Sequence, residues 1–210
     1  MIFKICGLRE KTSLICCAQN KVDFFGLVFY EKSPRNITID EAKSLVNFSK
    51  NLEIKPVGVF VNHNINNLKK IISYLDLKNI QLHGEENQSY IDEIKNNLDL
   101  KIIKKISIKT ANDLKKINNY KNIDYLLFDY KPEDNELPGG NSKTFDWSLL
   151  KEHKIKLPWF ISGGINESNI KNIQKLIKPN GIDLSSGVEE SKGIKSNQKI
   201  ENLFRVFYDN

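Results

Sequence analysis

Residues 159–187 read WFISGGINESNIKNIQKLIKPNGIDLSSG and contain two apolar runs, each ending in a turn of small residues. The turns are Ser162-Gly163-Gly164 and Ser185-Ser186-Gly187, and positions 163 and 185 lie 22 residues apart, the length of one strand-helix unit. Glycine lets backbone N–H groups approach an anion, and a helix that begins just beyond a turn adds its positive end. Either turn alone is more often only a turn, but the spaced pair predicts a phosphate site after the last two strands of an eight-stranded α/β barrel.

Short runs rich in β-branched and aromatic residues recur along the whole chain, with amphipathic Lys-, Asn- and Glu-rich segments between them. This pattern is typical of repeated β-α units around a parallel sheet. Five or six strands would suit an open doubly wound sheet, whereas eight favour a closed (β/α)8 TIM barrel. The eight predicted strands are Ile2–Cys6, Phe24–Phe29, Val57–Val61, Ile80–His83, Lys101–Ile106, Tyr125–Asp129, Trp159–Ser162 and Gly181–Ser185.

The segments between the predicted strands carry apolar residues three or four positions apart, which predicts helices. The one long connection, Tyr130–Thr144, is rich in Pro and Gly and follows the sixth strand, so we expect a mobile loop over the active face. Phe145-Asp146-Trp147 then marks the start of the next helix. The clearest helical patterns are Asp40–Leu52, Ile65–Leu75, Asn87–Leu98, Ala111–Tyr120 and Asn197–Tyr208.

Composition predicts one domain over residues 1–210, because 210 residues with 40% hydrophobic content suit one sizeable core. The sequence shows no signal-peptide pattern and no apolar run near the roughly 20 residues that a membrane helix needs, so we expect a soluble cytoplasmic protein with no membrane partner. Its three cysteines, Cys6, Cys16 and Cys17, lack the spacing of a disulfide framework or zinc site and are expected to be reduced. Cys16 and Cys17 fall within the first predicted helix and should be buried there.

The chain is basic, with a net charge of +6 and a pI of about 9.0. Its lysines are spread over nearly every predicted helix and form no stripe interleaved with aromatic residues, and no nucleic-acid motif is present. This distribution favours a general compositional bias over nucleic-acid binding, which is kept as the rival class.

In a barrel of this kind the active site lies at the carboxyl ends of the strands, and chemically useful residues stand there in this sequence. The first strand ends in Cys6, and the sixth ends in Asp129, roughly across the barrel. These two residues can therefore flank a small substrate that is anchored by its phosphate after the seventh and eighth strands. His83 ends the fourth strand, and Arg35 follows the second.

Seven runs carry a resemblance to a known family. They are Lys4–Gly7, Gly26–Phe29 with Ser33-Pro34-Arg35, Pro56–Phe60, Gln81–Gly84, Gly139-Gly140 with Lys143–Trp147, Ser162–Ile165 with Asn169, and Asp183–Glu189. In this order, over the entire chain, the runs resemble those of the phosphoribosylanthranilate isomerases. The resemblance implies a (β/α)8 enzyme of tryptophan biosynthesis that needs no cofactor or metal and acts on a small phosphorylated substrate.

The resemblance further implies an Amadori rearrangement of N-(5-phosphoribosyl)anthranilate to 1-(2-carboxyphenylamino)-1-deoxyribulose 5-phosphate. Such a reaction consists of proton transfers and needs an acid and a base. By the resemblance, Asp129 is the general acid that protonates the ring oxygen and opens the furanose. Cys6 is the general base that then removes the C2 proton of the ribose.

These two roles set requirements on pKa values. Asp129 must start protonated, so we expect burial and the anionic substrate to raise its pKa. A free thiol with a pKa near 8.5 is only slightly ionised at neutral pH, so a lowered pKa would favour Cys6 as a base. Lys4 lies two residues earlier on the same face of the strand and can supply that shift. An ion pair within the barrel core is an equally good account of Lys4.

The remaining substrate contacts also follow from the resemblance, each beside a plainer alternative. Arg35 is expected to hold the anthranilate carboxylate with its planar fork, the alternative being a surface arginine in a Pro-containing loop. Asp183 is expected to orient sugar hydroxyls or accept from backbone N–H groups. His83 and Gln81 position substrate or simply form structural hydrogen bonds, and the sequence does not decide between these.

One departure from the family pattern falls in the loop after the sixth strand. The family continues after Gly139-Gly140 with a small residue and then Gly, whereas this chain has Asn141-Ser142. We expect this change to stiffen the loop. The rival hypotheses are another phosphate-binding barrel enzyme and a non-catalytic phosphosugar-binding barrel, and the sequence leaves open whether the protein is a monomer or a homodimer.

Overall fold

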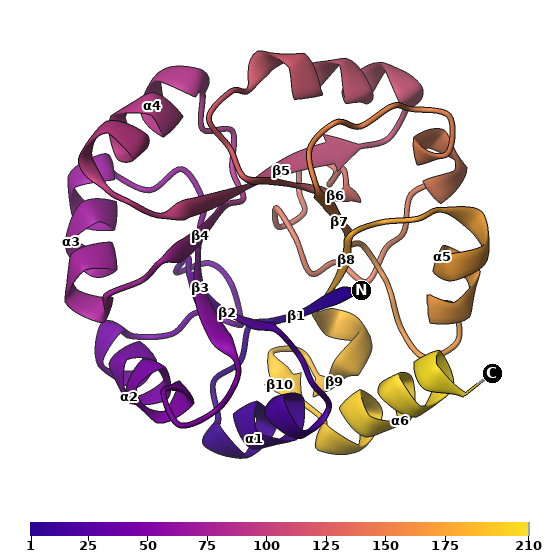
Figure 1. Ribbon diagram of the computed structural model, residues 1–210, viewed down its shortest axis with the longest axis horizontal. Helices are drawn as coiled ribbons and strands as arrows, with labels where there is room; N and C mark the ends of the chain where they lie inside the picture. Colours follow the sequence, from indigo (N-terminus) through magenta and orange to yellow (C-terminus); the bar gives the residue numbers. More distant parts are fainter. Residues whose placement is uncertain (210) are drawn as a thin grey trace.

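A computed structural model, in which residues 1–209 are described, shows a closed barrel of eight parallel strands in chain order. The barrel closes where β1 pairs with β8, with Lys4 beside Asp183 in the register. This confirms the predicted (β/α)8 fold, which Figure 1 shows along the barrel axis. The strands are β1 (Ile2–Cys6), β2 (Phe24–Phe29), β3 (Lys55–Phe60), β4 (Asn79–Leu82), β5 (Lys101–Ile108), β6 (Tyr125–Tyr130), β7 (Trp159–Ile161) and β8 (Gly181–Leu184).

Helices form an outer ring around the strands (Figure 1). Side-chain caps fix the start of several of them: Thr38 and Glu41 form a reciprocal capping box at α2, and Asn64 caps α3. The α-helices are α1 (Lys11–Gln19), α2 (Ile39–Ser49), α3 (Ile65–Leu75), α4 (Gln88–Asn97), α5 (Ile170–Leu176) and α6 (Asn197–Tyr208), and the 3₁₀ helices are η1 (Ala111–Asn119), η2 (Trp147–Leu150) and η3 (Ser186–Val188).

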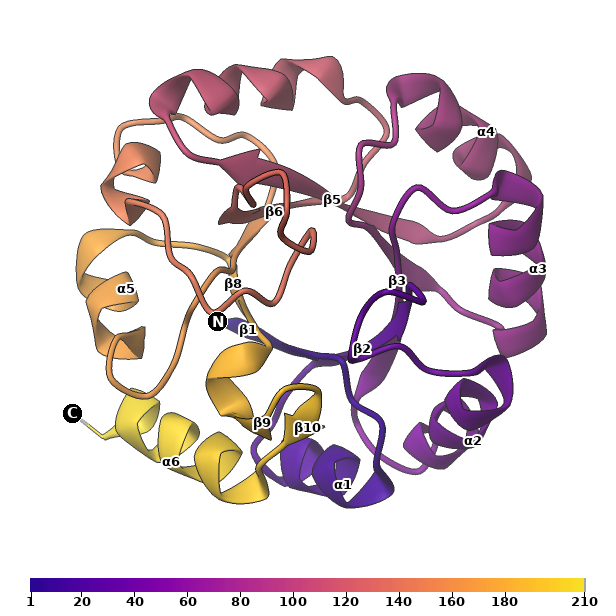
Figure 2. The same ribbon diagram turned by 180° about the vertical axis from the view of Figure 1, so that it is seen from behind.

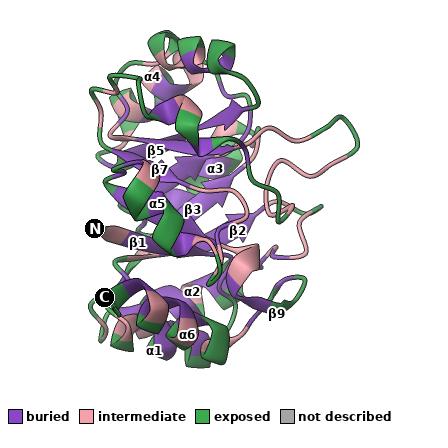
Figure 3. Cartoon of the chain, turned by 90° about the vertical axis from the view of Figure 1, so that its right-hand side faces the viewer, coloured by how far each residue is buried: buried purple, intermediate pink, exposed green. Residues whose placement is uncertain are grey.

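The strands are mostly buried (Figure 3) and contact two apolar clusters, one outside the barrel and one inside it. The larger cluster fills the space between the barrel and the helices and includes Cys16 and Cys17, as predicted. A small cluster fills the amino-terminal end of the barrel interior and consists of Val57, Ile103, Leu127 and Phe160. The interior is therefore packed at its amino-terminal end, and the two cavities lined by the predicted site residues lie at the carboxyl end.

The structure differs from the sequence prediction in three places. The segment predicted as a helix over Ala111–Tyr120 is the 3₁₀ helix η1, at whose start the Asp113 carboxylate accepts the N–H of the N-cap residue Thr110. After β8 the chain forms an unpredicted hairpin, β9 (Glu189–Ser191) with β10 (Ile194–Lys195). No helix begins directly after Gly164, because α5 starts only at Ile170. The positive helix end that we expected at the first turn is therefore missing.

The loop that follows β6 lies across the carboxyl-terminal mouth of the barrel (Figure 2). It ends at Asp146, whose side chain accepts the N–H of Ser148 and starts η2, in agreement with the predicted helix start. Ser142, which stands where the resembled family pattern has glycine, has a φ of 57°. A residue with a side chain therefore adopts a left-handed backbone conformation there, at a cost of about 1 kcal/mol.

Among the described residues, no helix is long and apolar enough to span a membrane.

Candidate active site

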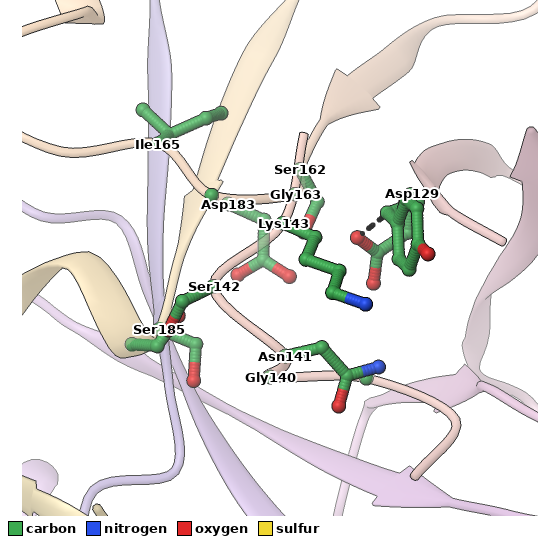
Figure 4. A pocket seen from close by; sticks show the side chains of 14 residues that line it. Asp129, Gly140, Asn141, Ser142, Lys143, Ser162, Gly163, Ile165, Asp183 and Ser185 are labelled. Carbon is green, nitrogen blue, oxygen red and sulfur yellow. Dashed lines mark hydrogen bonds between the residues drawn. The ribbon is translucent and has the colours of Figure 1, made fainter. Parts of the chain in front are cut away.

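The carboxyl ends of the strands bring the predicted catalytic and binding residues around two joined cavities. The larger, of about 550 Å³, is lined by Cys6, Arg35, His83, Asp129 and Asp183. The two carboxylates also line the smaller cavity, of about 360 Å³. This smaller cavity is also lined by Gly163, Gly164, Ser185 and Ser186 from the two small-residue turns. Figure 4 labels Gly163 and Ser185 of these turns.

The smaller cavity has the features expected for a phosphate site. Within the described part of the chain, the backbone N–H groups of Gly164, Ser186 and Gly187 donate no hydrogen bond to other protein groups. Gly187 itself is not among the residues that line this cavity, and a Cβ atom at this position would collide with the carbonyl oxygen of Ile165. Free N–H groups in a tight turn are a suitable anion cradle.

Asp129 is buried at the end of β6, with Oδ1 accepting the N–H of Tyr130 at 2.8 Å (Figure 4). Burial raises the pKa of Asp129 to about 6, against the opposing charge of Lys105. The predicted direction of this shift is therefore confirmed. A carboxyl group with such a pKa can still donate a proton near neutral pH.

Cys6 is buried at the end of β1, and its expected lowered pKa is not found. Burial raises the pKa of Cys6, and the nearby ammonium of Lys4 opposes this shift only in part. The reason is that Lys4 is shared: its Nζ atom lies 2.9 Å from Oδ1 of Asp183, and both side chains are buried. The ion pair within the barrel core is thus the correct account of Lys4, although its charge also reaches the thiol.

The imidazole of His83, just after β4, is held by Gln81 of that strand. Nε2 of Gln81 lies 2.8 Å from Nδ1 of His83, so the Nε2 atom of the imidazole carries the proton and faces Oδ2 of Asp129 at 3.6 Å. Burial, followed by the charge of Lys105, lowers the pKa of His83 well below its usual value. His83 is therefore a neutral donor beside the proposed acid. In the described structure, Oε1 of Gln81 is buried without a hydrogen-bond partner in the wall of the larger cavity.

Arg35 is buried rather than on the surface, which excludes the plainer alternative for this residue. Its Nε and Nη2 atoms donate to the two carboxylate oxygens of Glu189 at 2.7 and 2.8 Å. Lys195 also binds this carboxylate. Burial would raise the pKa of Glu189, but the hydrogen bonds from Arg35 and the charge of Lys195 lower it. Glu189 is therefore ionised and fixes the guanidinium at the edge of the cavity.

The sequence prediction missed the roles of Glu189, Lys195 and Lys105. Glu189 and Lys195 lie in the unpredicted hairpin, so their meeting with Arg35 had no local signal. Lys105 did leave one: Lys104 and Lys105 are adjacent on a predicted strand, and neighbouring side chains on a strand point to opposite faces. One of the two lysines therefore had to point into the barrel.

Among the described residues, no group of three or more His, Cys, Asp or Glu side chains is arranged to hold a metal ion.

Comparisons with known proteins agree with this geometry. The family model described as N-(5'phosphoribosyl)anthranilate (PRA) isomerase matches residues 3–206. The N-(5'-phosphoribosyl)anthranilate isomerase of Thermoanaerobacter pseudethanolicus is 40% identical over 200 residues, which cover 95% of this chain and 94% of the relative. That of Paramagnetospirillum magneticum is 37% identical over 205 residues, covering 97% and 95%.

A solved structure of similar shape is the phosphoribosyl anthranilate isomerase of Thermotoga maritima. Its TM-score is 0.86 at 30% identity, and the match covers 98% of each chain. A phosphoribosyl anthranilate isomerase in complex with reduced 1-(o-carboxyphenylamino)-1-deoxyribulose 5-phosphate has a TM-score of 0.82 at 29% identity, covering 98% of this chain and 97% of the other. These matches span nearly the whole chain and confirm the resemblance carried by its motifs. The chain belongs to the N-(5'-phosphoribosyl)anthranilate isomerase family.

Proposed function

We propose that this protein converts N-(5-phosphoribosyl)anthranilate to 1-(2-carboxyphenylamino)-1-deoxyribulose 5-phosphate, with Asp129 as the general acid and Cys6 as the general base. The observation that carries the proposal is that both residues line one cavity, which adjoins the turns suited to a phosphate. The acid and base thus lie within reach of a sugar whose 5-phosphate is held by Gly164 and the Ser186-Gly187 turn.

The first step opens the furanose ring. Asp129 gives its proton to the ring oxygen as the C1–O bond breaks, and the lone pair of the anthranilate nitrogen forms the C=N bond of a protonated Schiff base. Asp129 is left as a carboxylate. The substrate brings its own negative charges to the site, so its binding raises the fraction of Asp129 that is protonated at the start.

The second step removes the C2 proton. The Cys6 thiolate accepts this proton, and the C2–H electron pair forms the C1=C2 bond of an enolamine while the C=N pair returns to nitrogen. Protonation of C1 and loss of the C2 hydroxyl proton then give the ketone. Lys4 and Lys195 both lower the pKa of Cys6, which is raised mainly by burial, and so help the thiolate to form.

Three further residues are proposed to act at the site. Arg35 holds the anthranilate carboxylate. Its Nε and Nη2 atoms are occupied by Glu189, which leaves Nη1 for the substrate; Nη1 faces the backbone at Gly140, near the larger cavity. Asp183 contacts sugar hydroxyls: it lines both cavities, and its pairing with Lys4 holds the carboxylate in place beside the phosphate turn. His83 donates from Nε2 beside Asp129.

The test follows the loss of anthranilate-type fluorescence from freshly generated phosphoribosylanthranilate. Cys6→Ala and Asp129→Asn should each lower turnover by roughly 10²-fold or more while substrate binding is retained. Cys16→Ala is the matched control, since this thiol is buried in the outer core away from both cavities. A folded wild-type protein without isomerase activity would contradict the proposal.

We also propose that the enzyme works in the cytoplasm, as a monomer or a homodimer. The three cysteines are free thiols, which suits a reducing compartment. Light scattering during size-exclusion chromatography distinguishes the two oligomeric states, and cell fractionation tests the location.

A further inference from the structure

Lys105 is a charged residue that points into the barrel among the proposed catalytic groups. On the inner face of β5 it follows Ile103, a member of the apolar cluster inside the barrel. Its register partner on β6 is Leu127, another member of that cluster. Side chains two positions apart on a strand share a face, so Lys105 lies one step along the inner wall from both residues.

The strand register places Lys105 between His83 and Asp129. Gln81 on β4 is level with Ile103 on β5, so the next inward residues, His83 and Lys105, are also level. Asp129 is the inward residue that follows Leu127 on β6, a diagonal neighbour of Lys105. Diagonal neighbours lie about 7–8 Å apart at their Cα atoms, which a lysine side chain spans easily.

The ammonium group of Lys105 has few partners. The side chain is buried, and Nζ donates to the carbonyl oxygen of Pro138, in the loop after β6, at 3.2 Å. Within the described residues no carboxylate lies within 4.0 Å of this atom. Lys104, the outward neighbour, is also buried but pairs with Glu86 at 2.7 Å. A buried ammonium that one carbonyl alone satisfies is costly, so its retention inside the site calls for a role.

We propose that Lys105 is a positioning residue of this active site, whose ammonium ties the loop after β6 to the barrel and stabilises the carboxylate form of the neighbouring Asp129. The inference rests on the proposed function in one respect: the carboxylate is what remains after Asp129 has given its proton to the ring oxygen. Lys105 would thus stabilise the product side of the first step, and its charge adds to the effect of burial in lowering the pKa of His83.

Other charged groups also act on Asp129 and Lys105. Burial is the main cause of the raised pKa of Asp129, and the charge of Asp183, on β8, raises it further. The charge of Lys105 is the largest influence that lowers this pKa. Burial lowers the pKa of Lys105, and Asp129 is the largest opposing influence, followed by Glu85. Lys104 and Glu86 act on Lys105 with opposite signs and also pair with each other. Lys105 is therefore the cation that acts most directly on Asp129.

The experiment measures the pKa of the Asp129 carboxyl group by ¹³C NMR, in protein labelled with [¹³C]aspartate and without substrate. Asp129→Asn assigns the signal, which should titrate near pH 6 in the wild type. Lys105→Met keeps the length of the side chain and removes the charge, and should raise this pKa by about one unit, since an opposite charge nearby shifts a carboxyl pKa by about 1–3 units. Lys105→Gln is a second neutral variant in case Lys105→Met folds poorly.

The matched control is Lys101→Met, which removes one charge from the exposed amino-terminal end of the same strand and should leave the titration unchanged. Trypsin cleavage after Lys131 and Lys143 reports on the loop and should be faster in Lys105→Met. Faster cleavage with an unchanged Asp129 pKa would reduce Lys105 to a structural tether and overturn the proposal. Because the titration needs no turnover, its failure is distinct from a failure of the isomerase assignment.

Discussion

The guanidinium of Arg35 donates from Nε and Nη2 to both carboxylate oxygens of Glu189, at 2.7 and 2.8 Å. The two residues are 154 positions apart in the chain and are both buried. The N–H of Gly193 and the ammonium of Lys195 bind the same carboxylate. Glu189 therefore fixes the direction in which the remaining nitrogen of Arg35 points.

Glu189→Gln tests this relationship. The amide loses the charge-assisted fork, so Arg35 is less well oriented and KM for phosphoribosylanthranilate should rise about tenfold with kcat changed less than twofold, which corresponds to about 1.4 kcal/mol of binding. Since the change also leaves two buried cations uncompensated, the free energy of unfolding should fall by about 3 kcal/mol. Steady-state kinetics and urea unfolding measure both effects. Glu190→Gln, at the exposed neighbouring position, is the control, and an unchanged KM in Glu189→Gln would argue against this role.

Asp129→Asn should make the folded protein more stable at neutral pH. The pKa of Asp129 is raised from 3.8 to about 6 by burial, so ionising this group costs the folded state free energy above pH 6 and nothing below pH 4. A shift of this size corresponds to about 3 kcal/mol as an upper value. Thermal unfolding should therefore give a higher Tm for Asp129→Asn at pH 7 and equal values at pH 4. Asp134→Asn, in the exposed part of the loop, should show no gain at either pH.

Cys6 should alkylate slowly at neutral pH in the free enzyme. Only the thiolate reacts, and burial raises the pKa of Cys6 above that of a free thiol. The rate of labelling by iodoacetamide should therefore rise about tenfold per pH unit between pH 7 and pH 9. Peptide mass spectrometry separates Cys6 from Cys16 and Cys17. A plateau below pH 8 would mean that the thiolate already predominates, and would contradict this expectation.

Gly164→Ala should weaken phosphate binding. Gly164 has a φ of 63°, and an added Cβ would lie 2.7 Å from Cγ2 of Thr144 and 2.9 Å from the carbonyl carbon of Lys143. Accommodating it must displace the turn whose N–H faces the smaller cavity. We expect KM and the inhibition constant of inorganic phosphate both to rise about tenfold, or about 1.4 kcal/mol.

Gly193→Ala is the control for Gly164→Ala, because Gly193 also has a positive φ, of 90°, but lies in the hairpin against Pro34. It should lower Tm without changing phosphate inhibition. Equal phosphate inhibition in wild type and Gly164→Ala would remove the first turn from the phosphate site.

The barrel was predictable because its signals are local. All eight strands were placed from apolar runs, and β1 and β2 to the residue, since a buried strand needs such a run whatever it packs against. The η1 segment was predicted as a helix, and its apolar spacing did not distinguish a 3₁₀ helix from an α-helix. The hairpin β9–β10 was missed because Glu189 and Lys195 are stabilised by the distant Arg35 and not by their own neighbours.

The candidate site was predictable where residue type alone limits the chemistry, as for Cys6 and Asp129. The pKa of Cys6 was predicted in the wrong direction, because the extent of burial and the sharing of Lys4 with Asp183 depend on packing across the closed barrel. The place of Lys105 depends on strand register, which no single segment encodes. Such properties arise only when strands that are separate in the sequence pair with one another.

The loop after β6 contacts Lys105, Arg35 and His83 through its main chain. The carbonyl oxygens of Pro138 and Gly140 accept from Lys105 and Arg35, at 3.2 and 3.4 Å, and Gly139 lies too close to His83 to admit a Cβ atom. A roof built from peptide groups tolerates exchange of its exposed side chains but not a change in the number of residues that span the mouth. We therefore expect the enzyme to tolerate substitution of the exposed residues Glu133, Asp134 and Asn135, whereas insertions or deletions between β6 and Gly139 should lower its activity.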